Sequence, residues 1–294
     1  MAPKYVLITP LKNEEATIKQ VVESVKNQSI APCVWIIVND NSTDRSAQIL
    51  AQEVMNDKWI YVLNRCVNQE YNWLGYGDVI NYGIDFLNQL MATENVDSYD
   101  YIGLLDSDIT AEKRYFEKLI DYLSSHLDVG VVSGDILIQE CSDPESKWTV
   151  EYDTEHPRGG ARLYNYNIFR EIGGFPHTPS PDRASDIKIM NRGYRVQKLS
   201  IAQSFQHRKT HAKENEIKGF MTNGRGRYIL CYHFFHIIFL SLKLAAKKKP
   251  FILAGFMFFC GYISGFLTNS ERIKDDDIIK YSRGFLKRTL KRMF

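Results

Sequence analysis

The feature that most constrains the fold is the alternation, in the first half of the chain, of short apolar segments with amphipathic ones. The apolar segments have the length of strands: Tyr5–Thr9, Val34–Val38, Trp59–Leu63 and Tyr99–Leu105. The intervening and following segments place apolar residues at helical spacing: Glu14–Lys26, Thr43–Met55, Val79–Leu90 and a stretch through Tyr115, Leu119 and Leu123. Continuous apolar strands that alternate with amphipathic helices are typical of a parallel sheet covered on both faces. We therefore expect an α/β fold.

The pattern changes twice further along the chain. Strand-like pieces with Gly- and Pro-rich loops between them predict a mixed sheet there: Val129–Val132, Ile136–Ile138 and Arg195–Ile201. Two strongly apolar runs follow, Tyr228–Leu242 and Phe251–Leu267, with Lys247–Pro250 between them. We expect a catalytic domain at residues 1–218 and a C-terminal helical region at residues 219–294.

Charge is divided unevenly along the chain. Residues 1–200 hold 19 Lys and Arg against 29 Asp and Glu, whereas residues 201–294 hold 18 against 6. An acidic body is suited to cations and a basic tail to an anionic surface, although solvated surface charge would give the same counts. Long apolar runs interrupt the basic tail, which argues against binding of nucleic acid.

The 5 cysteines include no CxxC pair, so we expect free thiols rather than disulfides or a zinc ribbon.

Polar and acidic residues follow three of the predicted strands: Thr9–Glu14, Asn39–Asp44 and Asp106–Asp108. Each segment alone could be a helix cap or a turn. Ligands of open parallel sheets bind outside the carboxyl ends of the strands, so three such segments in equivalent places predict a ligand site.

The Asp106-Ser-Asp108 segment is the candidate metal site. Residues two apart on an extended backbone point the same way, so both carboxylates could face one Mg²⁺ or Mn²⁺ ion. An ion held by few protein ligands keeps positions for diphosphate oxygens and stabilises the charge on a departing nucleoside diphosphate.

These motifs, in this order, resemble family 2 glycosyltransferases of the GT-A fold over roughly residues 4–210. The matching segments are Thr9–Glu14 (P-x-x-N-E), Val38–Asp44 (V-D-D-G-S-T-D), Gly75–Asn81 (G-K-G-x-x-x-N), Asp106–Asp108 (DxD), and Gly159–Ala161 with Phe169–Phe175, which ends in G-G-F. Asn39, Asn41 and Tyr76 depart from the family pattern.

The resemblance implies a donor site for a nucleotide-diphosphate sugar, with a UDP-sugar favoured. Asp40 corresponds to the residue that contacts the base, for which a carboxylate suits the N3–H of uracil. The residues that correspond to the donor site are Thr9, Pro10, Asn13, Glu14, Asp40, Gly77, Asn81, Asp106 and Ser107.

The resemblance also implies the catalytic base. The family's ED pair corresponds to Pro181-Asp182, which makes Asp182 the candidate, with Asp186 as its rival. A carboxylate that deprotonates an acceptor hydroxyl opposite the leaving diphosphate gives an inverting reaction. His207 is either a third metal or diphosphate contact or a surface histidine. Three arginines could stabilise the leaving group: Arg158, Arg162 and Arg208.

The two apolar runs near the C-terminus are shorter than the roughly 20 residues of a bilayer span. Crossing as a hairpin would also put Lys247–Lys249 on the far side of the membrane, against the positive-inside preference. We expect peripheral or monotopic attachment to the cytoplasmic face of the cell membrane, and hence a lipid-linked or glycan acceptor. The alternative is a buried helical pair.

Two other functions compete with glycosyl transfer. A nucleotidyltransferase uses a similar sheet, but Thr9–Glu14 lacks the glycines of its phosphate loop. An inactive sugar-nucleotide-binding scaffold of a membrane complex would not need the acidic set Asp40, Asp106, Asp108 and Asp182.

Overall fold

The computed structural model describes residues 3–66, 75–94, 96, 98–139, 147–150, 156–178, 180–207, 216–247 and 251–291, without the side chains of residues 216, 247 and 285–291. The chain divides into two compact units. One comprises Met1–His177 and Pro181–Lys209, and we call it the sheet unit. The other, the helical unit, comprises Thr178–Ser180 and Thr210–Phe294. Arg208, Lys248, Lys249 and the side chains of the terminal basic stretch beyond residue 284 lie outside the described residues.

The sheet unit is built on one mixed sheet with the strand order β3-β2-β1-β4-β8-β6-β9-β5, and β7 pairs with β6. Its strands are β1 (Tyr5–Leu11), β2 (Val34–Asn39), β3 (Ile60–Asn64), β4 (Tyr101–Leu105), β5 (Ile109–Ala111), β6 (Val129–Gln139), β7 (Trp148–Val150), β8 (Ala161–Asn165) and β9 (Arg195–Gln206). Strands β3, β2, β1 and β4 run parallel, and β8 is antiparallel to both β4 and β6. The predicted α/β fold with a mixed, largely parallel sheet is confirmed.

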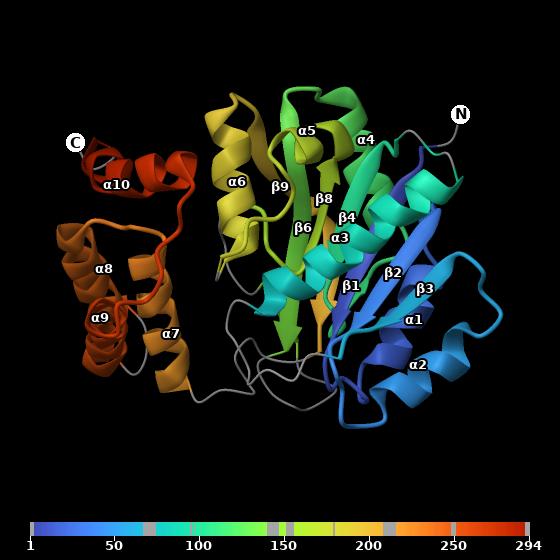
Figure 1. Ribbon diagram of the computed structural model, residues 1–294, viewed down its shortest axis with the longest axis horizontal. Coiled ribbons are helices and arrows are strands. Elements are labelled where there is room, and N and C mark those ends of the chain that lie inside the picture. The colour runs from blue at the N-terminus through green and yellow to red at the C-terminus, as the bar shows by residue number, and fades with distance from the viewer. Residues whose placement is uncertain are drawn as a thin grey trace. The chain divides into compact units, whose positions relative to one another are not determined.

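Helices cover both faces of this sheet (Figure 1). They are α1 (Ile18–Lys26), α2 (Ser46–Val54), α3 (Gly75–Glu94), α4 (Tyr115–Ser125), α5 (Tyr166–Glu171) and α6 (Pro181–Asn191). Because side chains alternate along a strand, Tyr5 and Leu7 of β1 pack in the core with α1, α2 and α4. Val6 and Ile8 pack in the other core, with α3, α5 and α6.

The predicted pieces Val129–Val132 and Ile136–Ile138 are one continuous strand, β6. The residues between them have low strand preference, but buried partners hold them in the sheet. The Gly134 N–H donates to the Tyr115 hydroxyl (2.8 Å), and the Asp135 carboxylate pairs with Lys198 Nζ (2.7 Å). Tertiary contacts therefore override local preference at this point.

The helical unit contains α7 (Glu216–Ile229), α8 (Phe234–Lys247), α9 (Phe251–Leu267) and α10 (Asp276–Lys291). The apolar run Tyr228–Leu242, which the sequence suggested was one element, is divided between α7 and α8. Cys231 breaks it by adopting a φ of 59°. None of the helices within the described residues is long and apolar enough to cross a membrane.

Glycines allow the helices of this unit to approach one another closely. A Cβ atom at Gly224 or Gly261 would collide with the carbonyl oxygen of Phe258 or Met221, so α7 and α9 are in backbone contact. Gly255 brings α9 equally close to Ser241 of α8. Small residues permit such packing, which leaves larger side chains for the outside.

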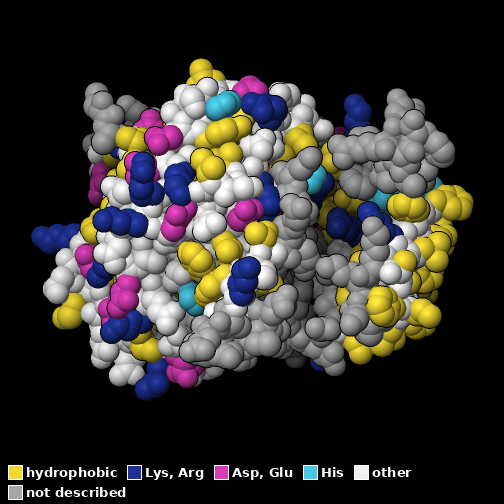
Figure 2. Space-filling model, turned by 180° about the vertical axis from the view of Figure 1, so that it is seen from behind, with side chains coloured by type: hydrophobic (Ala, Val, Ile, Leu, Met, Phe, Trp, Pro, Cys, Tyr) yellow, Lys and Arg dark blue, Asp and Glu magenta, His cyan; other side chains and the backbone are white. Residues whose placement is uncertain are grey.

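Large apolar side chains are exposed on α8 and α9: Phe235 by 64%, Ile252 by 80% and Phe256 by 59%. Figure 2 shows hydrophobic side chains gathered over this unit. We call the exposed apolar residues of α8 and α9 the apolar face: Phe234, Phe235, Ile238, Leu242, Phe251, Ile252, Leu253, Phe256, Phe266 and Leu267.

Candidate active site

The loops that follow β1 and β2 are joined by hydrogen bonds at the carboxyl edge of the sheet. Asn13 donates its N–H to Ser42 Oγ (3.1 Å), and its Oδ1 accepts the N–H of Thr43 (2.7 Å). The Glu14 N–H donates to the hydroxyl of Ser46 (2.7 Å). Asn13 has a φ of 55°, a left-handed conformation that asparagine tolerates better than most residues. These contacts give Asn13 and Glu14 a role in shaping the edge of the site.

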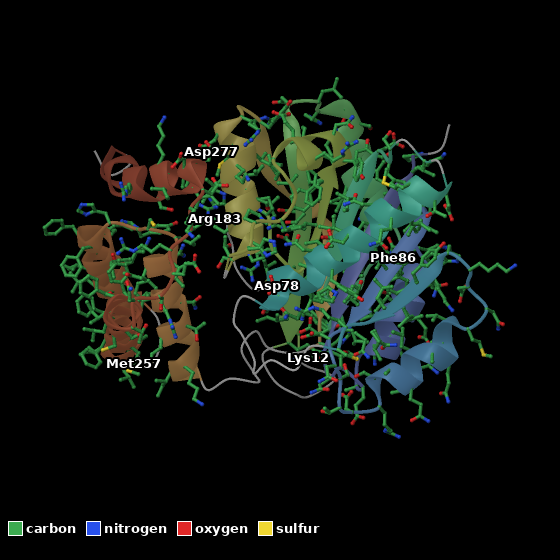
Figure 3. All side chains as sticks on the ribbon, in the orientation of Figure 1. Lys12, Asp78, Phe86, Arg183, Met257 and Asp277 are labelled. Atoms are coloured by element: carbon green, nitrogen blue, oxygen red, sulfur yellow. The ribbon has the colours of Figure 1, made fainter. Side chains whose placement is uncertain are left out.

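Asp40 lies beside this edge between two cations. Its Oδ2 is 3.1 Å from Lys12 Nζ, and its Oδ1 is 2.8 Å from Arg65 Nη1. Figure 3 marks Lys12, which comes directly after β1. Sequence reasoning missed Lys12 and Arg65, although Arg65 also follows a strand end, that of β3. The strand-end rule, applied to β3 as well, would have found it.

Asp106 and Asp108 flank the short connection between β4 and β5. We expected an extended backbone here, but the chain forms a turn. The Ile109 N–H donates to the Asp106 carbonyl (3.1 Å) and closes this turn. The reason is that β4 and β5 pair with different strands, β4 with β1 and β8 and β5 with β9, so the chain must change direction between them. The Asp108 carboxylate accepts a hydrogen bond from Gln206 Nε2 (3.3 Å).

Tyr76 contacts the first of these carboxylates. Its hydroxyl donates to Asp106 Oδ1 (2.7 Å). Burial, and then the negative charge of Asp106, raises the pKa of Tyr76 well above its ordinary value, so the hydroxyl remains a donor. The negative charge of Asp182 also raises this pKa. The sequence showed Tyr76 only as a departure from the family pattern and gave no sign of this contact.

Two consecutive glycines bring Asp106 and Asp182 to the same stretch of backbone. A Cβ atom at Gly160 would lie 2.8 Å from Asp106 Oδ2, and one at Gly159 would lie 2.8 Å from Asp182 Oδ2. The Asp106 N–H also donates to the Gly160 carbonyl (2.7 Å). The absence of side chains at residues 159 and 160 therefore permits the approach of both carboxylates.

Asp182 and Asp186, the two candidates for the base, have different surroundings. Asp186 is 2% exposed and accepts a hydrogen bond from Arg162 Nη1 (2.9 Å). Burial raises the pKa of Asp186 to about 6, although Arg162 opposes this shift. Asp182 lies in the first turn of α6, its side chain is 33% exposed, and its Oδ2 is 3.9 Å from Arg162 Nη2. Asp182 is thus the more accessible carboxylate.

Arg162 is fully buried, and its guanidinium makes hydrogen bonds to other groups of the protein. Its guanidinium donates to the carbonyls of Pro157 and Arg158 and to the Tyr164 hydroxyl, in addition to Asp186. It therefore supports the loop before Gly159 and the start of α6, and it is not positioned to meet a diphosphate. Arg158 donates its backbone N–H to Ser133 Oγ (2.8 Å), and Arg208 lies outside the described residues.

His207 contacts Asp108 through the backbone. Its N–H donates to the Asp108 carbonyl (2.9 Å), whereas its ring Nε2 lies 2.9 Å from Thr110 Oγ1. Burial lowers the pKa of His207. The described residues contain no group of three or more His, Cys, Asp or Glu side chains arranged to hold a metal. The assignment of His207 as a third metal ligand stays a prediction, and in this structure its imidazole contacts Thr110.

The remaining predicted donor residues have structural contacts. Thr9 is fully buried, and its hydroxyl accepts the indole N–H of Trp35 (2.9 Å), which turns it toward the core; Pro10, next to it in β1, is partly buried. Asn81 Nδ2 donates to the Phe175 carbonyl (3.2 Å), and the Ser107 carbonyl accepts the Thr17 hydroxyl (2.9 Å).

Gly77 lies in the first turn of α3, where a Cβ atom would be 3.6 Å from Pro176 O and Pro181. The next residue, Asp78, is marked in Figure 3 and contacts His177 Nδ1 at 2.9 Å. The start of α3 and the segment before α6 are thus connected beside the carboxylates.

Comparisons with known proteins identify the family and the fold. Residues 6–192 match the family model described as glycosyl transferase family 2. A mannosyltransferase, PcManGT from Pyrobaculum calidifontis, in complex with GDP-Man and Mn²⁺, is similar with a TM-score of 0.57 and 12% identity, over 99% of this chain and 80% of that one. TarS 1–349 of S. aureus in complex with UDP-GlcNAc is similar with a TM-score of 0.53 and 14% identity, over 99% and 77%.

A longer TarS structure from S. aureus is similar with a TM-score of 0.53 and 15% identity, over 84% of this chain. The match spans only 44% of that longer TarS chain. No curated protein sequence matches the chain. At these identities the structural likeness concerns the fold.

Proposed function

The chain belongs to glycosyl transferase family 2 and is a glycosyltransferase that uses a nucleotide sugar, and we propose that it transfers the sugar from a UDP-sugar to a lipid-linked or glycan acceptor with inversion. The observation that carries the mechanism is the meeting of Asp106 and Asp182 at Gly159 and Gly160. A donor-side carboxylate and an accessible carboxylate are both needed near the reacting carbon, and this backbone permits both.

In the proposed mechanism, Asp182 takes the proton of the acceptor hydroxyl as that oxygen attacks the anomeric carbon. A base must be ionised before it can accept a proton. Arg162 Nη2 lies 3.9 Å from Asp182 Oδ2, and the Asp182 side chain remains 33% exposed. Asp186 is unsuited to this role because it is buried against the same arginine.

We propose that Asp106 and Asp108 hold a Mg²⁺ or Mn²⁺ ion together with the diphosphate of the donor. The donor set fits, because carboxylate oxygens are the ligands that these hard cations prefer. Asp106 accepts a hydrogen bond from the neutral Tyr76 phenol, and Asp108 accepts one from the neutral Gln206 amide. When bound, the ion stabilises negative charge on the departing nucleoside diphosphate. The similar mannosyltransferase was solved with Mn²⁺, which supports this proposal.

We assign recognition of the nucleotide base to Asp40. Its two oxygens contact Lys12 and Arg65, but a carboxylate has about four acceptor positions and can still accept the N3–H of uracil. The two cations hold the orientation of the Asp40 carboxylate.

We further propose that the helical unit attaches the enzyme to the cytoplasmic face of the cell membrane, as a peripheral or monotopic protein. The support is the apolar face of α8 and α9, where ten large apolar side chains are exposed. Large exposed apolar surfaces mark sites of contact with protein partners or membranes. An enzyme attached in this way has direct access to a lipid-linked acceptor.

The decisive experiment screens UDP-, GDP- and dTDP-sugars for stabilisation of the full chain against heat, with Mn²⁺ and with excess chelator. A ligand that binds only the folded state stabilises it by about 2.7 kcal/mol at a hundred times its dissociation constant. We expect UDP-sugars with metal to give the largest shift. A larger shift with GDP- or dTDP-sugars would overturn the choice of UDP, and full transfer activity in chelator would overturn the metal.

A further inference from the structure

A groove with a volume of about 500 Å³ lies at the end of α9 in the helical unit. It is lined by Tyr228, Phe266, Asn269, Ser270, Glu271 and Arg272. We propose that it binds the phosphate of a lipid headgroup, an inference that rests on the proposed membrane attachment and goes beyond it by naming a site.

The wall of the groove is ordered by backbone hydrogen bonds. Asn269 has a φ of 47°, and the Ser270 N–H donates to the Gly265 carbonyl (3.0 Å), which together terminate α9 in a left-handed cap. Four residues after the cap, the Ile273 N–H donates to the Ile229 carbonyl at the end of α7 (3.0 Å). The segment is therefore fixed at both ends, so a ligand would meet preformed donors.

The groove presents an arginine suited to an oxyanion. The guanidinium carbon of Arg272 lies 4.2 Å from the centre of the Tyr228 ring, a cation–π contact that restrains the group over the ring. Among the described residues no carboxylate is within ion-pair distance of Arg272. The neighbouring Glu271 pairs with Lys274 instead (2.9 Å). A stacked guanidinium offers its N–H edge, which matches the oxygens of a phosphate.

A second arginine contacts the wall of the groove. Arg225 donates from Nε and Nη2 to the hydroxyl oxygen of Ser270, at 3.1 and 2.9 Å. This hydroxyl lines the groove and lies 3.0 Å from Thr268 Oγ1, whose own O–H donates to the Ser264 carbonyl (2.8 Å). Ser270 is therefore held in place on both sides and orders the wall of the groove beside Arg272.

The apolar surroundings indicate a lipid rather than a free anion. Phe266 lines the groove and is 64% exposed, and Leu267 beside it is also exposed. Both belong to the apolar face. A ligand that satisfies the arginine and covers these side chains must carry a phosphate at one end and hydrocarbon next to it.

The test compares Arg272→Gln with Lys274→Gln in the full chain. Each variant removes one positive charge from the same segment, but Lys274 is paired with Glu271 and does not line the groove. Binding is measured by co-sedimentation with phosphatidylcholine vesicles that carry either phosphatidic acid or a fatty acid at equal surface charge.

We expect Arg272→Gln to weaken binding to phosphatidic acid vesicles roughly tenfold more than Lys274→Gln does, the scale of one hydrogen-bonded charge pair. On fatty acid vesicles the two variants should be equal. Equal losses on both kinds of vesicle would overturn the site, because surface charge alone would explain them.

Soluble probes separate this proposal from membrane attachment itself. If the unaltered chain binds no vesicles, the attachment fails, and the groove is tested by heat stabilisation with short-chain dihexanoyl phosphatidic acid. Stabilisation that Arg272→Gln abolishes would uphold the groove, whereas no stabilisation would overturn it. Equal stabilisation by inorganic phosphate would overturn the lipid assignment.

Discussion

The sheet unit and the helical unit place apolar and polar groups in opposite ways. In the sheet unit, large apolar side chains fill two cores. Its carboxylates have polar partners inside the unit: Asp106 accepts a hydrogen bond from Tyr76, and Asp186 accepts one from Arg162. In the helical unit, glycines occupy several helix contacts and aromatic side chains face outward. One surface is suited to polar chemistry and the other to an apolar environment. Substitutions in the sheet unit should therefore affect glycosyl transfer without membrane attachment, and substitutions in the helical unit should do the reverse.

The largest effect on the sheet unit should come from Asp182→Asn. The amide cannot take a proton, so transfer to the acceptor should fall by at least ~100-fold. The donor should still stabilise the variant against heat, because Asp182 is assigned to the acceptor side. Vesicle binding by the helical unit should be unchanged. Normal transfer by this variant would remove Asp182 from the mechanism.

The next largest effect should be a loss of stability from Asp186→Ala. The substitution leaves the fully buried Arg162 without its carboxylate, and breaking a buried pair in this way costs about 3–5 kcal/mol. Urea unfolding measures it. The control is Asp128→Ala, whose partner Arg195 is half exposed, so that the loss of stability should be far smaller. Similar losses from both variants would contradict the structural role of Asp186.

Much of the fold could be predicted because the apolar pattern of the first half is compatible with one arrangement, a parallel sheet between two layers of helices. Tyr5–Thr9 and Val34–Val38 are apolar throughout, and such strands are stable only between two layers of helices. The break at Cys231 could not be predicted, because the run Tyr228–Leu242 contains neither Gly nor Pro. Helix packing, not local preference, ends α7 there.

The candidate site was predicted where it depends on strand ends and missed where it depends on tertiary approach. Asp40 and Asp106 follow β2 and β4 directly, so their position was accessible from spacing. The Tyr76 hydrogen bond joins residues 30 positions apart, and the turn at Asp106 depends on how β4 and β5 pair. The direction of His207 likewise depends on Thr110, a neighbour that only the fold supplies.

A smaller effect should come from Tyr76→Phe, which removes the hydroxyl that Asp106 accepts. A hydrogen bond to a charged group contributes about 1.5–3 kcal/mol, so the Mn²⁺ concentration needed for half-maximal stabilisation by nucleoside diphosphate should rise roughly tenfold. The control is Tyr82→Phe on the same helix, where the ring is exposed. An unchanged Mn²⁺ dependence would show that the contact with Asp106 does not position a metal ligand.

Asp40→Ala should affect the Michaelis constant for the donor more than turnover. The base lies away from the reacting carbon, so its contacts contribute to ground-state and transition-state binding alike. Removal of the carboxylate also leaves Lys12 and Arg65 without their shared partner. Steady-state kinetics with a UDP-sugar measure the two constants. A turnover defect with an unchanged Michaelis constant would contradict the assignment.

The smallest effect on folding and chemistry should come from the apolar face, through the double variant Phe235→Gln and Ile252→Gln. Both side chains are largely exposed, so each substitution should change the free energy of unfolding by about 0.5 kcal/mol or less. Hydrolysis of the donor should be unchanged, because every residue assigned to the donor belongs to the sheet unit. Binding to vesicles should nevertheless fall sharply, since burial of apolar area in the lipid drives insertion, whereas salt screens only the charges.

The matched control, Met55→Gln with Leu127→Gln, also replaces two exposed apolar side chains, but in the sheet unit. If this control loses as much vesicle binding as the variant of the apolar face, exposed apolar residues act without regard to position and the contrast between the two units does not hold.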